Sequence, residues 1–88
     1  MTMVIAAQSY IIDCDHGTLR HDLIRCQPMV VAPVHIRRDV WIGAGAKVLK
    51  GSYISDGAVI GAQSLVKGRV DPYSINIGIP VRKIGERV

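Results

Sequence analysis

Aliphatic residues recur every six positions along most of the chain. Over the C-terminal part the spacing is unbroken, and each recurring residue is β-branched: Ile36, Ile42, Val48, Ile54, Ile60 and Val66. Four positions after each of these stands a residue of small or modest size, expected where the chain bends: Val40, Ala46, Ser52, Ala58, Ser64 and Val70. A helix repeats about every 3.6 residues and a half-buried strand about every 2, so neither explains this pattern. The repeat predicts short strands, each followed by a turn.

The spacing continues upstream after an interruption. Val30 fits one more unit, and Ile5 and Ile11 fit two more, but positions 11 and 30 are 19 apart. We therefore expect a loop excursion over residues 17–29. Three units can close one triangular turn, and stacked turns bury the aliphatic residues that a single turn leaves exposed. The predicted turns are 5/11/30, 36/42/48 and 54/60/66.

The predicted fold is therefore all-β, a parallel β-helix of about three coils. It forms one domain over residues 1–88, with a tail over residues 72–88 that forms a short extension or a helix. The alternative is a β-sandwich with glycine turns, which predicts strands of about five to six residues that alternate with period two. That alternative gives no reason for a period of six.

Composition narrows the classes of function. Apolar residues make up 49% of the 88 residues, which argues against disorder. No apolar run approaches the roughly 20 residues of a membrane span. The net charge of +4 comes without a basic run interleaved with aromatics, so we expect no nucleic acid, and a small anionic ligand explains it equally well. Cys14 and Cys26 form no C-x-x-C pair and indicate reduced thiols in a cytoplasmic protein.

Two segments carry a resemblance to a known family. The segments "VWIGAGAKVLKGSYISDGAVIGAQSLV" and "DPYSINIGIPVRKI" resemble the hexapeptide-repeat acyltransferases, most closely the maltose and galactoside type of sugar O-acetyltransferase. The more specific parts are "DVWIGAG", "DCDHG" and the Gly78-x-Pro80 turn with basic residues after it. The resemblance implies a left-handed coil, an exception to the usual right-handed crossover. It also implies a homotrimer, acetyl-CoA as donor, and active sites between neighbouring subunits.

The chain departs from this family at its start. It begins inside the repeat at Met1, whereas family members usually have further coils upstream. This predicts an N-terminally truncated member. It also keeps open a second hypothesis, a noncatalytic trimeric scaffold that is the remnant of such an enzyme.

His16 is the candidate catalytic base. Acyl transfer from a thioester to a hydroxyl needs a base of near-neutral pKa, and histidine supplies one. His16 ends the unit "IIDCDH" at the mouth of the excursion, and the resemblance implies that it is the catalytic histidine. Asp13, Asp15 or a backbone carbonyl would orient its ring. His21 and His35 are weaker candidates, and His35 is expected to face outward.

Three histidines also raise a zinc hypothesis. Gamma-class carbonic anhydrases share the coil and bind zinc through three histidines at subunit interfaces. A zinc site needs about three protein ligands and an open position. Here one or two of the ligands would come from the excursion instead of the coil wall, so we expect no metal.

Small residues beside the single tryptophan are the candidate donor site. The resemblance places Trp41 beside the catalytic histidine and the pantetheine arm, while the alternative is packing on the outer face or in a trimer contact. The N–H of Ala44 is the candidate oxyanion donor. Gly61 and Ala62, in the next coil, suit the path of the pantetheine because small residues let a thin ligand approach the backbone.

Basic and polar residues complete the expected site. The CoA phosphates would be held by cations near the C-terminus, of which Arg82 is the best match, unless these form an ordinary solvated tail. The cationic candidates are Lys67, Arg69, Arg82 and Lys83, with Arg37 and Arg38 as further possibilities. The expected rim of the acceptor pocket is polar and is formed by Asp15, Arg20 and Arg25.

Overall fold

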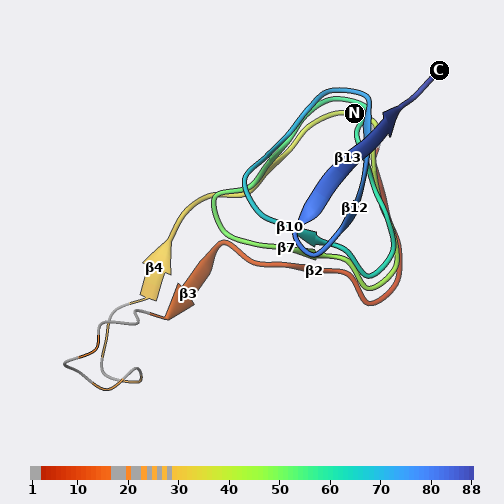
Figure 1. Ribbon diagram of the computed structural model, residues 1–88. Helices are drawn as coiled ribbons and strands as arrows, with labels where there is room; N and C mark the ends of the chain where they lie inside the picture. Colours follow the sequence, from red (N-terminus) through yellow and green to blue (C-terminus); the bar gives the residue numbers. More distant parts are fainter. Residues whose placement is uncertain (1–2, 17–19, 21–22, 24, 26, 28) are drawn as a thin grey trace.

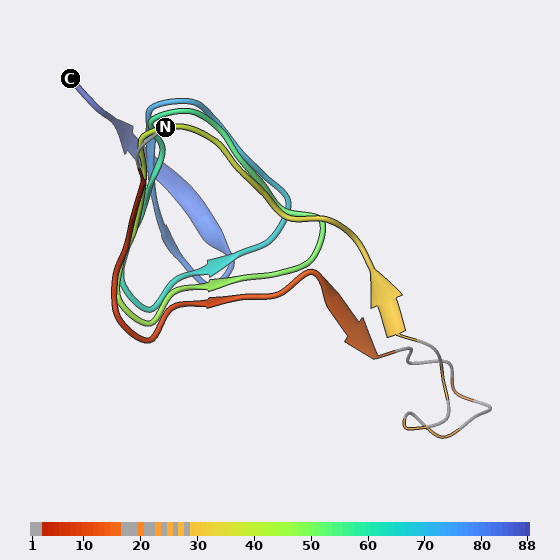
Figure 2. The ribbon, with the colours of Figure 1, turned by 180° about the vertical axis from the view of Figure 1, so that it is seen from behind.

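The chain winds around the sides of a triangle. The computed structural model describes residues 3–16, 20, 23, 25, 27 and 29–88, with the backbone alone at residues 3 and 14–16. Figure 1 looks along the coil axis with the C-terminal turns toward the viewer, and the chain runs clockwise as it approaches. That sense is left-handed, and Figure 2 shows the same coil from behind. The predicted fold class, an all-β parallel β-helix, is confirmed.

Each side of the triangle is a sheet of short strands that are parallel within the coil. The first sheet contains β1 (Met3–Ile5), β6 (Val40–Ile42), β9 (Val59–Ile60) and β12 (Ser74–Gly78), with β13 (Val81–Glu86) antiparallel at its edge. The second sheet contains β2 (Tyr10–Ile11), β7 (Lys47–Val48) and β10 (Leu65–Val66). The third contains β5 (His35–Ile36), β8 (Tyr53–Ile54) and β11 (Arg69–Val70). The first corner joins the first sheet to the second, the second corner joins the second to the third, and the third corner leads back to the first.

The core is a set of aliphatic ladders, as the period of six predicts. In the first sheet Ile42 pairs in register with Ile5 on one side and with Ile60 on the other. Five of the recurring aliphatic residues are fully buried: Ile42, Val48, Ile54, Ile60 and Val66. The smaller residues expected at the bends are buried as well, from Val40 at 1% exposure to Ser52 at 0%. Residues two apart on a strand face the same side, so each unit directs two side chains inward.

The first turn differs from the prediction, which was wrong at Val30. Val30 lies in β4 (Met29–Val31), which pairs antiparallel with β3 (Cys14–His16) outside the coil wall. The N–H of Ala32 donates to the carbonyl of Asp13 at 2.8 Å and closes the base of the excursion. The wall resumes at β5, so the first turn is 5/11/36, and Ile36 pairs with Ile54.

The last turn and the C-terminus also differ in detail. Val70, expected at a bend, instead pairs with Ile54 in the third ladder, because only four positions separate it from Val66. The C-terminal extension is the strand β13 and not a helix. Val81 packs partly against the core. The sandwich alternative is wrong, because the strands of the coil pair in parallel.

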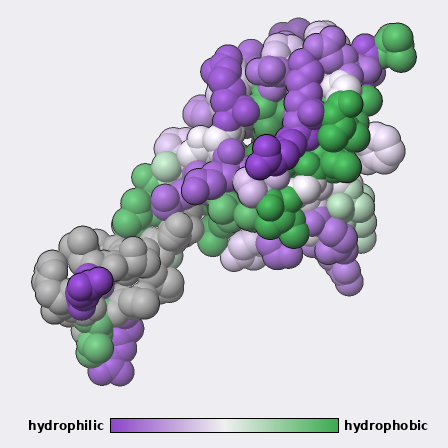
Figure 3. Space-filling model, in the orientation of Figure 1, coloured by the Kyte–Doolittle hydropathy of each residue, from purple (hydrophilic) through white to green (hydrophobic). Residues whose placement is uncertain are grey.

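The C-terminal end of the interior is polar. Asn76 follows Ile60 in the first ladder, and its Nδ2 donates to Ser74 Oγ at 2.8 Å and to the carbonyl of Val59 at 3.2 Å. Figure 3 views this end, where apolar residues stand among hydrophilic ones. The β12–β13 hairpin leaves Ile77, Ile79 and Ile84 exposed. No helix in the described part of the chain is long and apolar enough to span a membrane.

Candidate functional site

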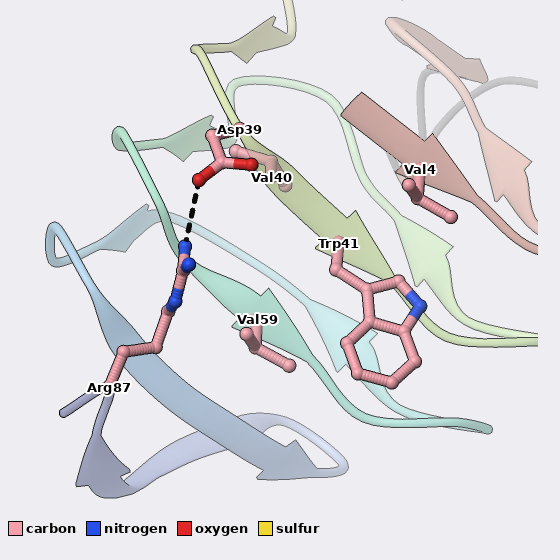
Figure 4. A pocket seen from close by; sticks show the side chains of 6 residues that line it. All are labelled: Val4, Asp39, Val40, Trp41, Val59 and Arg87. Carbon is pink, nitrogen blue, oxygen red and sulfur yellow. Dashed lines mark hydrogen bonds and ion pairs between the residues drawn. The ribbon is translucent and has the colours of Figure 1, made fainter. Parts of the chain in front are cut away.

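Trp41 stands on the outer face of the first sheet, at the middle of a groove. Its neighbours on β6, Val40 and Ile42, point into the core, so Trp41 points outward and is 55% exposed. Val4 and Val59 flank it in register on β1 and β9. Figure 4 shows the indole beside these two side chains. The groove measures about 450 Å³ and is lined by Val4, Asp39, Val40, Trp41, Val59 and Arg87.

An ion pair forms the polar end of this groove. Nη1 of Arg87 donates to Oδ2 of Asp39 and to the carbonyl of Gly57, both at 3.1 Å. The backbone N–H of Arg87 donates to the carbonyl of Tyr73 at 2.8 Å. Asp39, Gly57 and Tyr73 occupy the third corner in three successive turns, so Arg87 links these turns. Arg87 is not among the residues predicted from the sequence, because its partner lies 48 positions away and the contact depends on the return of β13.

Small residues gather at the first corner, at the other end of β6. A Cβ added at Gly43 would lie 2.6 Å from the nitrogen of Ala62, so the two turns approach closely there. The N–H of Gln63 donates to the carbonyl of Ala44 at 2.9 Å. Ala44 and Ala62 are both exposed, and among the described residues the N–H of Ala44 has no backbone acceptor. The structure therefore brings together the predicted residues Ala44, Gly61 and Ala62.

The predicted cations lie on different elements. Arg82 is exposed and pairs in register with Ile77, whose side chain covers Gly61 at the first corner. Nζ of Lys83 donates to Oε1 of Glu86 at 2.6 Å. This hydrogen bond raises the pKa of Lys83 and lowers the pKa of Glu86. Lys67 is exposed at the second corner, one side of the triangle away from Ala62.

The predicted base and the predicted acceptor residues lie in the excursion and in the strand β3 that leads into it. The backbone of His16 pairs with Met29 and that of Asp15 with Val30, while the side chains of both lie outside the described part. Arg20 and Arg25 are exposed, and His21 is not among the described residues. The excursion leaves the coil at the second corner, opposite the first sheet (Figures 1 and 2). Within one chain, His16 and Trp41 therefore lie on opposite sides of the coil.

The third sheet carries a separate row of outward side chains. The rings of His35 and Tyr53 are 5.7 Å apart, and the guanidinium of Arg69 lies 4.7 Å from the centre of the Tyr53 ring. His35 is exposed, as expected. Among the described residues no group of three or more His, Cys, Asp or Glu could hold a metal ion.

Comparison with known proteins agrees with this geometry. Residues 33–68 match the bacterial transferase hexapeptide family (six repeats). The chain is 36% identical over 87 residues to a protein of Mycobacterium tuberculosis named as a probable acetyltransferase, covering 98% of this chain and 29% of that protein. A solved maltose O-acetyltransferase from Clostridium difficile 630 is 31% identical with a TM-score of 0.87, covering 96% of this chain and 44% of that one. A galactoside acetyltransferase in complex with coenzyme A is 30% identical with a TM-score of 0.78, covering 97% and 45%.

The chain therefore spans less than half the length of each of these proteins. The part that it shares with them includes the six-residue repeat, the coil, and the strand that carries Trp41. By its repeat, its fold and these similarities, the chain belongs to the hexapeptide-repeat transferases.

Proposed function

We propose that the chain is the β-helical part of a CoA-dependent O-acetyltransferase that acetylates a hydroxyl of a sugar or a similar small compound. The observation that carries the proposal is the exposed indole of Trp41 beside a corner of glycine and alanine. The coenzyme A bound by the similar galactoside enzyme and the sugar named for the maltose enzyme support the same chemistry. An acetyl-CoA donor also suits the cytoplasm that the cysteine usage predicts.

The donor would lie along the first corner. Ala44 and Ala62 present no side chain larger than a methyl group, so a pantetheine arm can run against the backbone there, with the Ile77 side chain that covers Gly61 as an apolar wall beside it. Arg82 and Lys83 supply positive charge toward the C-terminal end, where CoA phosphates need it. The N–H of Ala44 would then face the carbonyl oxygen of the thioester.

The reaction is the attack of an acceptor hydroxyl on the thioester carbon. His16 takes the proton of the hydroxyl as the new C–O bond forms, and the N–H of Ala44 stabilises the negative oxygen of the tetrahedral intermediate. Collapse of the intermediate breaks the C–S bond, and the imidazolium returns the proton to the sulfur. One oxyanion donor supplies about 3 kcal/mol to such a step.

The site would be shared between copies of the chain. In one coil, β3 with His16 leaves at the second corner and β6 with Trp41 belongs to the first sheet, so the base beside a given indole has to come from a neighbouring copy. A ring of three copies lets the excursion of each meet the first sheet of the next. This supports a homotrimer with coil axes roughly parallel.

The test separates binding from chemistry in the full chain. Calorimetry with acetyl-CoA measures donor affinity, and thiol release in the presence of maltose measures turnover. We expect His16→Ala to lower kcat by about 10²–10⁴ with donor affinity nearly unchanged. Arg82→Ala is expected to weaken acetyl-CoA binding about tenfold or more, with a smaller effect on kcat at saturation.

Two outcomes would contradict this proposal. If the parent chain binds no acetyl-CoA, the noncatalytic scaffold becomes the better explanation. If a variant lacking both Arg82 and Lys83 binds acetyl-CoA as tightly as the parent, the proposed position of the phosphates is wrong.

A further inference from the structure

We propose that the groove between Trp41 and the Asp39–Arg87 pair binds the uncharged pyranose ring of the acceptor. The inference deepens the proposed function and rests on it, because it names the subsite and the class of the acceptor. It places recognition on the wall of the coil, whereas the acceptor residues predicted from the sequence are Asp15, Arg20 and Arg25.

The apolar part of the groove suits one face of a sugar ring. The C–H bonds on that face carry slight positive charge, which fits the negative face of an exposed indole. Val4 and Val59 extend the apolar surface on both sides of Trp41, through strands paired in register. The groove of about 450 Å³ lies within the range of roughly 300–1,000 Å³ that is typical of small-molecule sites.

The polar end of the groove offers donors and acceptors together. Arg87 uses Nη1 for Asp39 and Gly57, and among the described residues its Nε and Nη2 make no hydrogen bond. Asp39 uses Oδ2 for Arg87 and presents Oδ1 as a further acceptor. Sugar hydroxyls both donate and accept, so they can pair with these atoms simultaneously.

The charge of the pair favours a neutral ligand. The Asp39 carboxylate lies 3.1 Å from Arg87 and offsets the guanidinium charge, so an anionic group in the groove would face the carboxylate at close range. Both side chains are partly open to solvent, at 41% exposure for Arg87 and 67% for Asp39. The groove thus has the polarity of a hydroxyl-binding site and lacks the uncompensated positive charge that a phosphate needs.

The groove is also in the right place relative to the proposed donor path. β6 runs from the third corner, where Asp39 lies, to the first corner, where Gly43 and Ala44 lie, and Trp41 is between them. A pyranose in the groove and a pantetheine arm at the first corner would approach the indole from opposite ends of this strand. An acceptor hydroxyl would then meet the thioester over Trp41.

The experiment titrates the full chain with three neutral sugars, glucose, galactose and maltose, and with glucose 6-phosphate as the charged comparison. Trp41 is the single tryptophan, so its fluorescence reports directly on the groove, and acetyl-CoA binding is measured separately by calorimetry. Asp39→Asn and Arg87→Lys change the polar end conservatively, and Asn tolerates the positive φ of 54° at position 39. The matched control is Asp56→Asn, which removes a different ion pair near the same corner, between Asp56 and Arg37 at 3.9 Å.

We expect at least one sugar to shift the fluorescence, and both groove variants to raise its Kd about tenfold or more. The control should bind this sugar within twofold of the parent, and acetyl-CoA affinity should be unchanged in all three variants. If acetyl-CoA binds but no sugar does, or if the groove variants bind sugar like the parent, this inference is overturned and the proposed function stands. Tighter binding of glucose 6-phosphate than of any neutral sugar would also overturn it. A chain that binds sugar through the groove but no acetyl-CoA would instead overturn the proposed function.

Discussion

Ile60 lies between Ile42 and Asn76 in the first ladder and is 1% exposed. Ile60→Asp would place a carboxylate in an aliphatic interior that offers no charged partner. We expect a loss of about 4 kcal/mol or more in the free energy of unfolding, enough to prevent folding of a small chain. Circular dichroism during thermal unfolding measures this loss.

Val59 provides the matched control on the same strand. Its side chain faces outward and is only partly buried, so Val59→Asp should retain most of the stability. If Ile60→Asp melted like the parent, or if both variants lost the same stability, the inward register of the repeat would be wrong.

Gly43 shows how closely two turns approach at the first corner. A Cβ there would lie 2.6 Å from the nitrogen of Ala62 and 2.9 Å from the carbonyl carbon of Gly61, and both contacts are with backbone. Backbone cannot rotate away, so Gly43→Ala should cost about 1–3 kcal/mol. Gly85→Ala is the control, because a Cβ there meets nothing within 4 Å. Equal denaturation midpoints for the two variants would show that the corner is looser than described.

The inward residues could be predicted from spacing alone, but the partners of charged residues could not. Ile42, Ile54 and Ile60 repeat a local rule, because each unit has the same relation to the one before it. Arg87 follows no such rule. Its contacts with Asp39 and Gly57 exist because β13 reverses direction and brings the end of the chain back to the third corner.

Among the elements, the first turn shows what a period cannot predict. Val30 satisfies the spacing, yet β4 pairs with β3 and leaves it 47% exposed. An aliphatic residue at the right interval enters the wall only if its backbone can pair with the neighbouring turn. Here the two arms of the excursion pair with each other, so the wall continues at Ile36. The irregular spacing predicted that the wall is interrupted, but it did not predict that β5 is the strand at which the wall resumes.

The β13 strand holds one of its cations in an ion pair. The hydrogen bond with Glu86 raises the pKa of Lys83 and lowers that of Glu86. If Lys83 holds a CoA phosphate, Glu86 competes for it. We therefore expect Glu86→Gln to tighten acetyl-CoA binding about two- to fivefold at low salt, the usual weight of an exposed pair. Calorimetry measures the change.

The pH dependence and a double variant check this competition. A carboxyl with a lowered pKa stays ionised until the pH falls through that pKa, so the advantage of Glu86→Gln is present at neutral pH and disappears in acid. In a Lys83→Gln background, Glu86→Gln should change nothing beyond its nonspecific charge effect. An equal gain with and without Lys83 would show that the effect is long-range charge and not release of this lysine.

At the scale of the whole molecule, the two halves of the proposed site face away from each other. The strand β3, which ends at His16, leaves at the second corner, and Trp41 lies on β6 in the first sheet, across the triangle. The sequence contained both motifs, and the resemblance placed them in one site between subunits. Spacing alone could not show that the two motifs lie on opposite sides of one coil. Their separation depends on the corner at which the chain leaves the coil, and the 19-residue spacing between Ile11 and Val30 does not specify that corner.

This separation leads to a prediction about mixed assemblies. In the proposed site, a trimer of His16→Ala chains lacks every base and a trimer of Trp41→Ala chains lacks every indole, so each variant alone should be nearly inactive. The two variants are then mixed, unfolded and refolded together. A site in the mixed trimer is intact when its His16 comes from a Trp41→Ala copy and its Trp41 comes from the neighbouring His16→Ala copy. Random assembly makes about one quarter of the sites intact. Light scattering should first show a trimer at micromolar concentration, and thiol release should then recover about one quarter of parental turnover.

The controls for the mixture follow from the same geometry. The two variants mixed without unfolding should stay inactive if the trimers do not exchange subunits, so recovered activity has to depend on co-assembly. A mixture of His16→Ala and Arg82→Ala chains tests the donor side. In its intact sites, the Arg82→Ala copy supplies His16 and the His16→Ala copy supplies Arg82. The acetyl-CoA affinity of those sites should equal that of the parent. If the His16→Ala and Trp41→Ala mixture stays inactive after co-refolding although each variant forms trimers, the base and the indole act within one chain. The excursion would then have to reach around the coil, against the arrangement of the second corner and the first sheet.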